Sequence, residues 1–168
     1  MPLLAALRQR VDGIRVRSRG AFHALAAQPV VDPKRIAAIG YCFGGVSSLE
    51  LARDGADIVA LVGFHIPLRT TRPDDARNIK AAILICTGSK DREATVEDRA
   101  AFKQEMRDGG VADRRISLYD NVWHSFINPD ADSYGKPDYA RYDAHAHRRS
   151  WAEMSTFLSE TFARRDAA

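Results

Sequence analysis

The chain of 168 residues has few cysteines, no long apolar run and little net charge. Its two cysteines, Cys42 and Cys86, are too few for a disulfide scaffold and lack the CxxC or Cys/His spacing of a metal site. No segment approaches the about 18 apolar residues that a membrane-spanning helix needs, and no signal-peptide core with a cleavage site begins the chain. These absences predict a cytoplasmic protein without a metal.

The charge is nearly balanced, with 25 Lys and Arg against 22 Asp and Glu. The excess of +3 is local, because five arginines gather near the start of the chain: Arg8, Arg10, Arg15, Arg17 and Arg19. No aromatic residues are interleaved with them, so we expect neither nucleic acid nor a membrane as a partner. With 45% apolar residues, the composition is that of one globular domain spanning residues 1–168.

Short apolar runs alternate with segments of helical periodicity. The runs predict strands at residues 35–40, 58–64, 81–86 and 115–119, and the periodic segments predict helices at residues 3–27, 43–54, 93–108 and 138–163. This alternation predicts an α/β fold with a parallel sheet of about four strands flanked by helices. The last helix is expected to bury Tyr142, Trp151, Met154, Leu158 and Phe162.

The segment Gly40-Tyr41-Cys42-Phe43-Gly44-Gly45 lies directly between the first strand and the following helix. This position is typical of a nucleophile elbow, here with cysteine in place of serine. Gly40 and Gly44 are expected to leave space for the sharp turn, and the helix N-terminus favours a thiolate at Cys42. The backbone N–H of Phe43 is the candidate oxyanion donor. The alternative is a buried cysteine beside a tight turn.

A catalytic thiol needs a base and a group that orients the base, and the chain supplies both. Asp91 follows the third predicted strand and His124 follows the fourth. Because the carboxyl ends of parallel strands meet at one edge of a sheet, these side chains are expected to lie near Cys42. The order Cys, Asp, His is that of an α/β-hydrolase triad.

The segment Val31-Asp32-Pro33-x-Arg35-Ile36-Ala37-x-Ile39-Gly40, together with the elbow, resembles the core of the dienelactone hydrolase family. Gly88-x-x-Asp91, His124-Ser125-Phe126 and the spacing of Ala144 and Trp151 resemble it too. The resemblance implies a hydrolase of small esters or lactones that uses no cofactor. It makes Cys42 the nucleophile, His124 the general base and Asp91 the orienting carboxylate.

Two departures from the family modify this expectation. Family members that open dienelactones carry an arginine soon after the histidine, whereas this chain has Ile127-Asn128-Pro129, so dienelactone itself is not the expected substrate. The strands that precede the elbow in the family are missing, and with them the second oxyanion donor. We therefore expect an N-terminally truncated fold and weak activity. Because the edge of the predicted strand at residues 35–40 is exposed, we also expect either an oligomer or a monomer that associates non-specifically.

Two other functions compete with this interpretation. A catalytically weak or inactive family member would act as a binding or oligomerising module. A glutamine amidotransferase also has a cysteine elbow, but it uses a His-x-Glu near the chain end, whereas Ser125 and Phe126 follow His124.

Several residues near the predicted site have weaker assignments. Tyr41, Phe43, Trp123 and Phe126 are expected to bound a small substrate pocket, with ordinary packing as the alternative for the last two. His65, at the end of the second strand, is interpreted as a structural histidine or as a residue that lines the entrance of the predicted active site. Arg69 and Arg72, in the loop after the second strand, are candidates for attracting an anionic substrate, with a solvated loop as the alternative. The predicted helix places His145 and His147 on different faces, which argues against a metal site.

Overall fold

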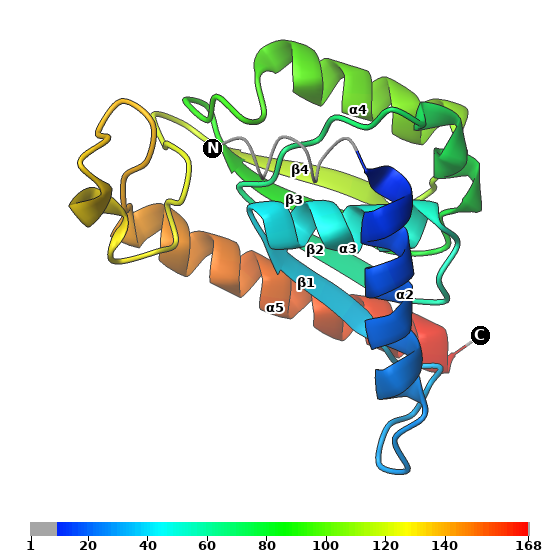
Figure 1. The fold of residues 1–168 in the computed structure, drawn as a ribbon. Coiled ribbons are helices and arrows are strands. Elements are labelled where there is room, and N and C mark those ends of the chain that lie inside the picture. Colours follow the sequence, from blue (N-terminus) through cyan, green and yellow to red (C-terminus); the bar gives the residue numbers. More distant parts are fainter. Residues whose placement is uncertain (1–9, 168) are drawn as a thin grey trace.

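Four parallel strands, neighbours in chain order, form the central sheet of the computed structural model, which describes residues 10–167 (Figure 1). The strands are β1 (Ala37–Tyr41), β2 (Ala60–Phe64), β3 (Ala82–Gly88) and β4 (Arg114–Tyr119). The register pairs Gly40 with Gly63 and Phe64 with Cys86, so the carboxyl ends of the first three strands are level. The predicted parallel α/β sheet is confirmed.

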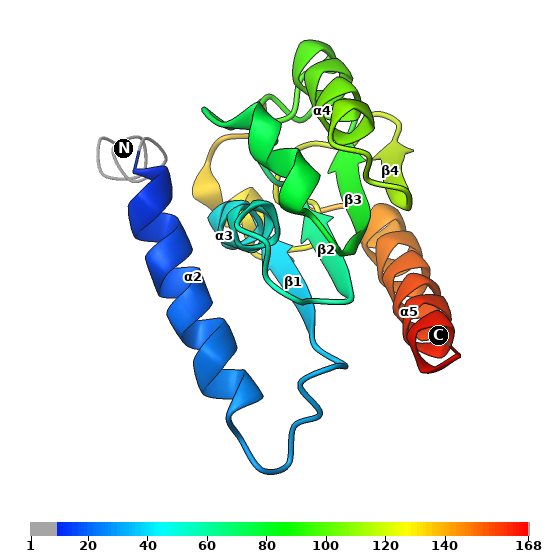
Figure 2. The same cartoon turned by 90° about the vertical axis from the view of Figure 1, so that its right-hand side faces the viewer.

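Helices cover both faces of this sheet (Figures 1 and 2). One face carries α3 (Phe43–Arg53) and α4 (Val96–Asp108), and the other carries α5 (Ala144–Asp166). Helix α2 (Val11–Ala26) packs on the outer side of α3. Two short 3-10 helices lie in loops, η1 at Pro73–Asn78 and η2 at Ala131–Tyr134.

The sheet separates two apolar cores. Leu61 and Ile83 face the side of α3 and α4, while Val62 and Leu84 face α5. Strands that are buried on both faces carry continuous rather than alternating apolar residues, as residues 58–64 do. The central strands thus form a rigid support for the loops at their carboxyl ends.

A buried ion-pair network fixes the helix that follows the elbow. The Arg53 guanidinium, 1% exposed, donates to Glu50 of the same helix at 2.8 Å and to Glu105 of α4 at 2.7 and 2.9 Å. Arg15 of α2 donates to the other Glu50 oxygen at 2.8 and 2.9 Å. Buried charges need such pairing, so α3 is held from both sides by charge-assisted hydrogen bonds.

The structure corrects two sequence expectations on the last helix. It begins at Ala144 rather than near residue 138, because the Asp143 side chain accepts hydrogen bonds from the backbone N–H groups of His145 and Ala146 and caps it. Trp151 is 49% exposed rather than buried, since the face toward the sheet is made by Met154 and Phe157.

The N-terminal helix and strand β1 were also the subject of sequence predictions. Predicted helical residues 3–9 lie outside the described residues, and the described helix begins at Val11. Within residues 10–167, only β2 pairs with β1, and Ile39 is 43% exposed. The expected association of copies through this strand stays a prediction.

No helix in the described part of the chain is long and apolar enough to cross a membrane.

Candidate active site

Three side chains named from the sequence meet at the carboxyl edge of the sheet. Cys42 Sγ lies 3.3 Å from His124 Nε2, and His124 Nδ1 lies 3.1 Å from each carboxylate oxygen of Asp91. Asp91 and His124 are buried, whereas Cys42 is half-buried at the surface of the site. The arrangement joins a thiol, an imidazole and a carboxylate in a line.

The elbow at Cys42 is a strained turn. Its φ of 49° is rare for a side-chain-bearing residue, and the residue directly precedes α3. A Cβ at Gly40 would lie 2.4 Å from Gly45 Cα, and one at Gly45 would lie 1.9 Å from Ile66 Cγ2. The turn therefore requires glycine at positions 40 and 45.

Gly44 differs from the sequence expectation. Apart from its chain neighbours and the backbone of its own helix, no described atom lies within 4 Å of the place where its Cβ would be, so the turn leaves open space there. The position after Cys42 that has no room for a side chain is Gly45, which faces back onto Gly40 and the Ile66 side chain.

The loops that carry Asp91 and His124 are attached to each other. Lys90 and Ser89 N–H donate to the carbonyls of Val122 and Tyr119 at 2.9 and 2.8 Å. Gly88 permits this approach, because a Cβ there would lie 2.0 Å from the Val122 oxygen. The Asp91 carboxylate also accepts the Glu93 N–H at 2.9 Å, which fixes its orientation toward His124.

The surroundings of His124 favour its charged form. Burial alone would lower its pKa, but the hydrogen bonds to Asp91 and Cys42 and the charge of Asp91 together raise the pKa of His124 to about 9. The imidazole therefore carries a proton at neutral pH, next to the sulfur. An imidazolium in this position stabilises a thiolate at Cys42.

His65 lies in the same site, closer than its interpretation as a structural histidine suggested. Its ring stands edge-on to that of His124, with centroids 4.7 Å apart, and the residue is 4% exposed. Burial and the nearby charge of His124 lower the pKa of His65 to about 3, so this ring is neutral. The sequence feature that indicates this position is the place of His65 directly after β2. The two strands beside β2 are β1, which is followed by Cys42, and β3, which is followed by the Asp91 loop.

The four residues expected to bound a pocket occupy different environments. Tyr41 is 40% exposed and stacks on Phe64, while Trp123 is half-buried. Phe43 is the first residue of α3, where the backbone N–H precedes the helical hydrogen-bond ladder. Phe126 is fully buried against Tyr119 and His65, so it supports the site from the core.

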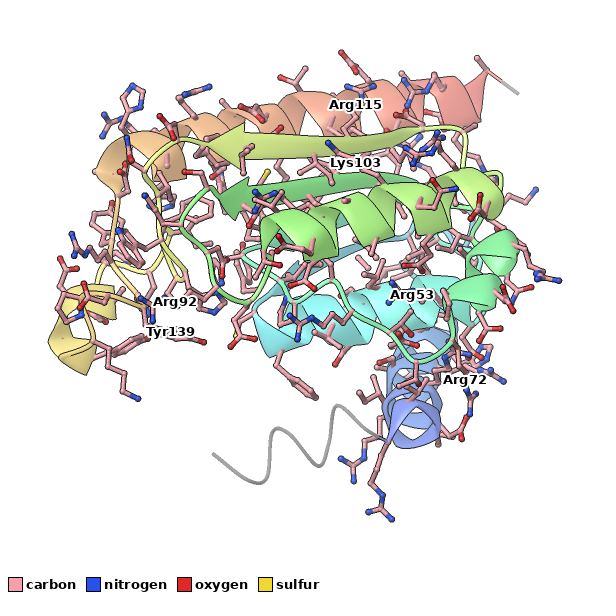
Figure 3. All side chains as sticks on the ribbon, turned by 90° about the horizontal axis from the view of Figure 1, so that it is seen from above. Arg53, Arg72, Arg92, Lys103, Arg115 and Tyr139 are labelled. Atoms are coloured by element: carbon pink, nitrogen blue, oxygen red, sulfur yellow. The ribbon has the colours of Figure 1, made fainter. Side chains whose placement is uncertain are left out.

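Two neighbours of His124 and Asp91, the aromatic Tyr139 and the acidic Glu93, were not predicted from the sequence. The ring of Tyr139 lies 5.2 Å from that of His124, and the Tyr139 hydroxyl donates to Glu93 at 3.0 Å. Tyr139 and Arg92 lie together at the end of the sheet to which the strands point (Figure 3). Tyr139 is in an irregular loop, which returns to the site through a parallel bridge between His124 and Ala140, and no periodic pattern marks it.

Other candidates from the sequence lie outside the site. Arg69 and Arg72 are paired with carboxylates, Arg69 with Asp98 at 2.5 Å and Arg72 with Asp12 at 2.7 Å. Burial raises the pKa of the Cys86 thiol to about 12, as expected for an inert thiol inside a strand.

Comparison with known proteins relates most of the chain to one family. The sequence profile of the dienelactone hydrolase family matches residues 3–162. An uncharacterized protein of Caenorhabditis elegans, K02A2.1, is 33% identical over 159 residues, which are 89% of this chain and 95% of that protein.

Two solved structures share both fold and sequence with this chain. The protein named m3DLH is 38% identical with a TM-score of 0.89 over 95% of this chain and 66% of its own. A dienelactone hydrolase-like promiscuous phosphotriesterase, P91, from metagenomic libraries is 38% identical with a TM-score of 0.83 over 94% and 66%. This chain thus spans about two thirds of the length of each of these structures.

Proposed function

The chain belongs to the dienelactone hydrolase family, and from this premise we propose that it hydrolyses small carboxylic esters or lactones with Cys42 as nucleophile, His124 as acid and base, and Asp91 as the orienting group. The observation that carries the proposal is the pair of short contacts on His124, 3.3 Å to the Cys42 sulfur and 3.1 Å to Asp91. The proposal includes no cofactor.

The first half of the reaction forms a thioester. The Cys42 thiolate attacks the carbonyl carbon, and the carbonyl electron pair moves to the oxygen, which accepts a hydrogen bond from the Phe43 N–H. The oxyanion then collapses, the bond to the alcohol oxygen breaks, and His124 donates its Nε2 proton to the departing oxygen.

The second half releases the acid. His124 Nε2, now unprotonated, takes a proton from a water molecule as that water attacks the thioester carbon. The carbon–sulfur bond breaks and returns the thiolate beside the imidazolium. Asp91 accepts the Nδ1–H throughout, so that the nitrogen that gives up and takes back the catalytic proton is always Nε2, which faces the sulfur.

A direct test separates a competent site from an inactive binding module. Iodoacetamide should alkylate Cys42 far faster than Cys86, because Cys42 is half-exposed beside an imidazolium while Cys86 is fully buried with a raised pKa. Peptide mass spectrometry identifies the alkylated residue, and the same method should find an acetyl group on Cys42 during turnover of p-nitrophenyl acetate. Equal labelling of both thiols, or no acetylated Cys42, would contradict the proposal.

Substrate size gives a second prediction. The large side chains next to Cys42 and His124 in the sequence are Tyr41, Phe43 and Trp123, all at least partly exposed, and Arg141 lies over the Trp123 ring at 5.0 Å. We expect these groups to restrict the space for an acyl chain, so kcat/KM for p-nitrophenyl acetate should exceed that for the decanoate by at least about tenfold. A panel of p-nitrophenyl esters of increasing chain length measures this, and a preference for the long chains would contradict it.

The pH dependence gives a third prediction. The proton that His124 gives to the leaving group is held with a pKa of about 9, so kcat/KM should fall as the pH rises through that value. Asp91→Asn removes a hydrogen bond and a charge that raise this pKa, so the alkaline fall should move toward neutral pH by at least about one unit. Rate profiles of both proteins measure the shift.

The matched control is Asp108→Asn, which removes an exposed carboxylate on α4 that bonds only to Gln104 among the described contacts. Its profile should equal that of the unaltered protein. An Asp91→Asn profile with the same alkaline fall would show that Asp91 does not act on the His124 proton.

A second candidate substrate is a phosphotriester. The observation that favours it is the 38% identity to a structure described as a promiscuous phosphotriesterase. The same thiolate would attack phosphorus and expel an aryloxide. A diethyl aryl phosphate therefore belongs in the substrate panel, and turnover of this compound with no turnover of any ester would favour the second candidate.

A further inference from the structure

We propose that Cys42, His65 and His124 form a binding site for a thiophilic divalent cation, with Zn²⁺ as the best match. One donor atom from each residue, the Cys42 sulfur and one ring nitrogen of each histidine, lies within 4.8 Å of the other two. A thiolate with two imidazoles suits Zn²⁺, whereas Mg²⁺ and Ca²⁺ prefer oxygen ligands.

The distances are close to those of a tetrahedral site. Bonds of about 2.1 Å to nitrogen and 2.3 Å to sulfur place neighbouring ligand atoms about 3.3 to 3.6 Å apart. The Cys42 sulfur and His124 Nε2 are already 3.3 Å apart. The His65 ligand nitrogen lies within 4.8 Å of both of these atoms, and Cys42 is half-exposed, so that water can reach the site as a fourth ligand.

The environment of His65 is the second, independent observation. Its Nδ1 is buried and has no hydrogen-bond partner in the structure, which is rare for a polar atom in a protein interior. The residue has a φ of 43°, and its backbone N–H donates to the Cys86 carbonyl at 2.8 Å, so the backbone directs the ring into the site.

His124 already has the partner that metal-bound histidines usually have. Both Asp91 oxygens lie 3.1 Å from its Nδ1, so the carboxylate orients the ring and leaves Nε2 to face the sulfur. A carboxylate–histidine–zinc arrangement of this kind fixes the ligand and raises its basicity. Binding of Zn²⁺ would release the Nε2 proton to solvent and form bonds to the sulfur and both rings.

Such a cation would act as a reversible inhibitor, because it occupies the two atoms that the thiolate mechanism uses. This inhibition rests on the proposed function, whereas the binding itself does not. The site would thereby connect hydrolysis to the availability of free zinc.

The experiment measures binding and turnover on the full chain, kept reduced with a phosphine that does not chelate metals. Competition with a chromophoric chelator gives the Zn²⁺ affinity, and titration with Co²⁺ gives the near-ultraviolet absorption of a thiolate–cobalt bond. We expect one ion per chain and loss of turnover in step with Zn²⁺ binding. His65→Asn should weaken Zn²⁺ binding by more than about tenfold, and Asp91→Asn by about 10- to 100-fold.

The control is His145→Asn, which removes an exposed histidine far along the sequence and should leave the affinity unchanged. Asparagine at position 65 tolerates a positive φ, which favours correct folding, and thermal melting checks this. Should it fail to fold, Cys42→Ser decides, because the thiolate–cobalt absorption must disappear. Equal Zn²⁺ affinity in folded His65→Asn, or cobalt absorption that survives in Cys42→Ser, overturns the site.

The two proposals fail separately. A chain that binds Zn²⁺ through these residues but hydrolyses no ester supports the metal site and contradicts the hydrolase. A chain that hydrolyses esters unaffected by Zn²⁺ and shows no thiolate–cobalt absorption overturns the metal site and leaves the hydrolase standing.

Discussion

Cys42→Ala is expected to lower kcat/KM for p-nitrophenyl acetate by at least about a thousandfold, because removal of the nucleophile leaves no thiolate to form the thioester. The change deletes one sulfur atom from a half-exposed side chain, so the fold should persist. Initial rates with the purified variant measure the loss, and circular dichroism confirms that it is folded.

The matched control is Cys86→Ala, which removes the other thiol. Cys86 lies inside β3 and is fully buried, so its loss should cost stability through a small cavity while turnover is retained. His124→Ala should reduce turnover about as much as Cys42→Ala, and the double variant should be no worse than either, because the two residues act as one unit. Undiminished turnover in Cys42→Ala would refute the assignment.

Gly40→Ala is expected to lower the free energy of unfolding by at least about 3 kcal/mol. The new Cβ would lie 2.4 Å from Gly45 Cα and 2.5 Å from its nitrogen, both backbone atoms that cannot move aside without opening the elbow. The nucleophile would be displaced as well, so turnover should fall with stability. Urea denaturation followed by circular dichroism measures the change.

Gly44→Ala provides the control from the same turn. No described atom would contact its Cβ, and alanine inside a helix is more favourable than glycine by about 0.5 to 1 kcal/mol. This variant should therefore equal or exceed the unaltered protein in stability. Equal denaturation midpoints for the alanine variants at positions 40 and 44 would contradict the packing argument.

The elbow and the residues around it could be predicted from the sequence because their signals are local. A glycine-flanked cysteine between a buried strand and a helix is visible in six residues, and the chain order of Asp91 and His124 follows from where strands end. The structure places these side chains in contact, which the edge of a parallel sheet requires.

Other features could not be predicted because they depend on tertiary packing. The proximity of His65 to His124 requires a positive φ after β2, which neighbouring residues do not encode. Tyr139 comes near only because its loop returns along His124. The exposure of Trp151 depends on which face of α5 meets the sheet, and that face carries Met154 and Phe157.

The contacts of the elbow glycines differ in kind, and this difference governs how damage to the turn could be repaired by a second mutation. A side chain at position 45 would meet mainly the Ile66 side chain, whose Cγ2 and Cβ would lie 1.9 and 2.9 Å away, so glycine at position 66 would remove both contacts and act as a suppressor. A side chain at position 40 would meet only the backbone of residues 44 and 45 among its nearest atoms, and glycine is already the smallest residue available there. In a genetic selection, a substitution at position 45 can therefore be suppressed by a second mutation at position 66. A substitution at position 40 can be corrected only by restoring glycine there.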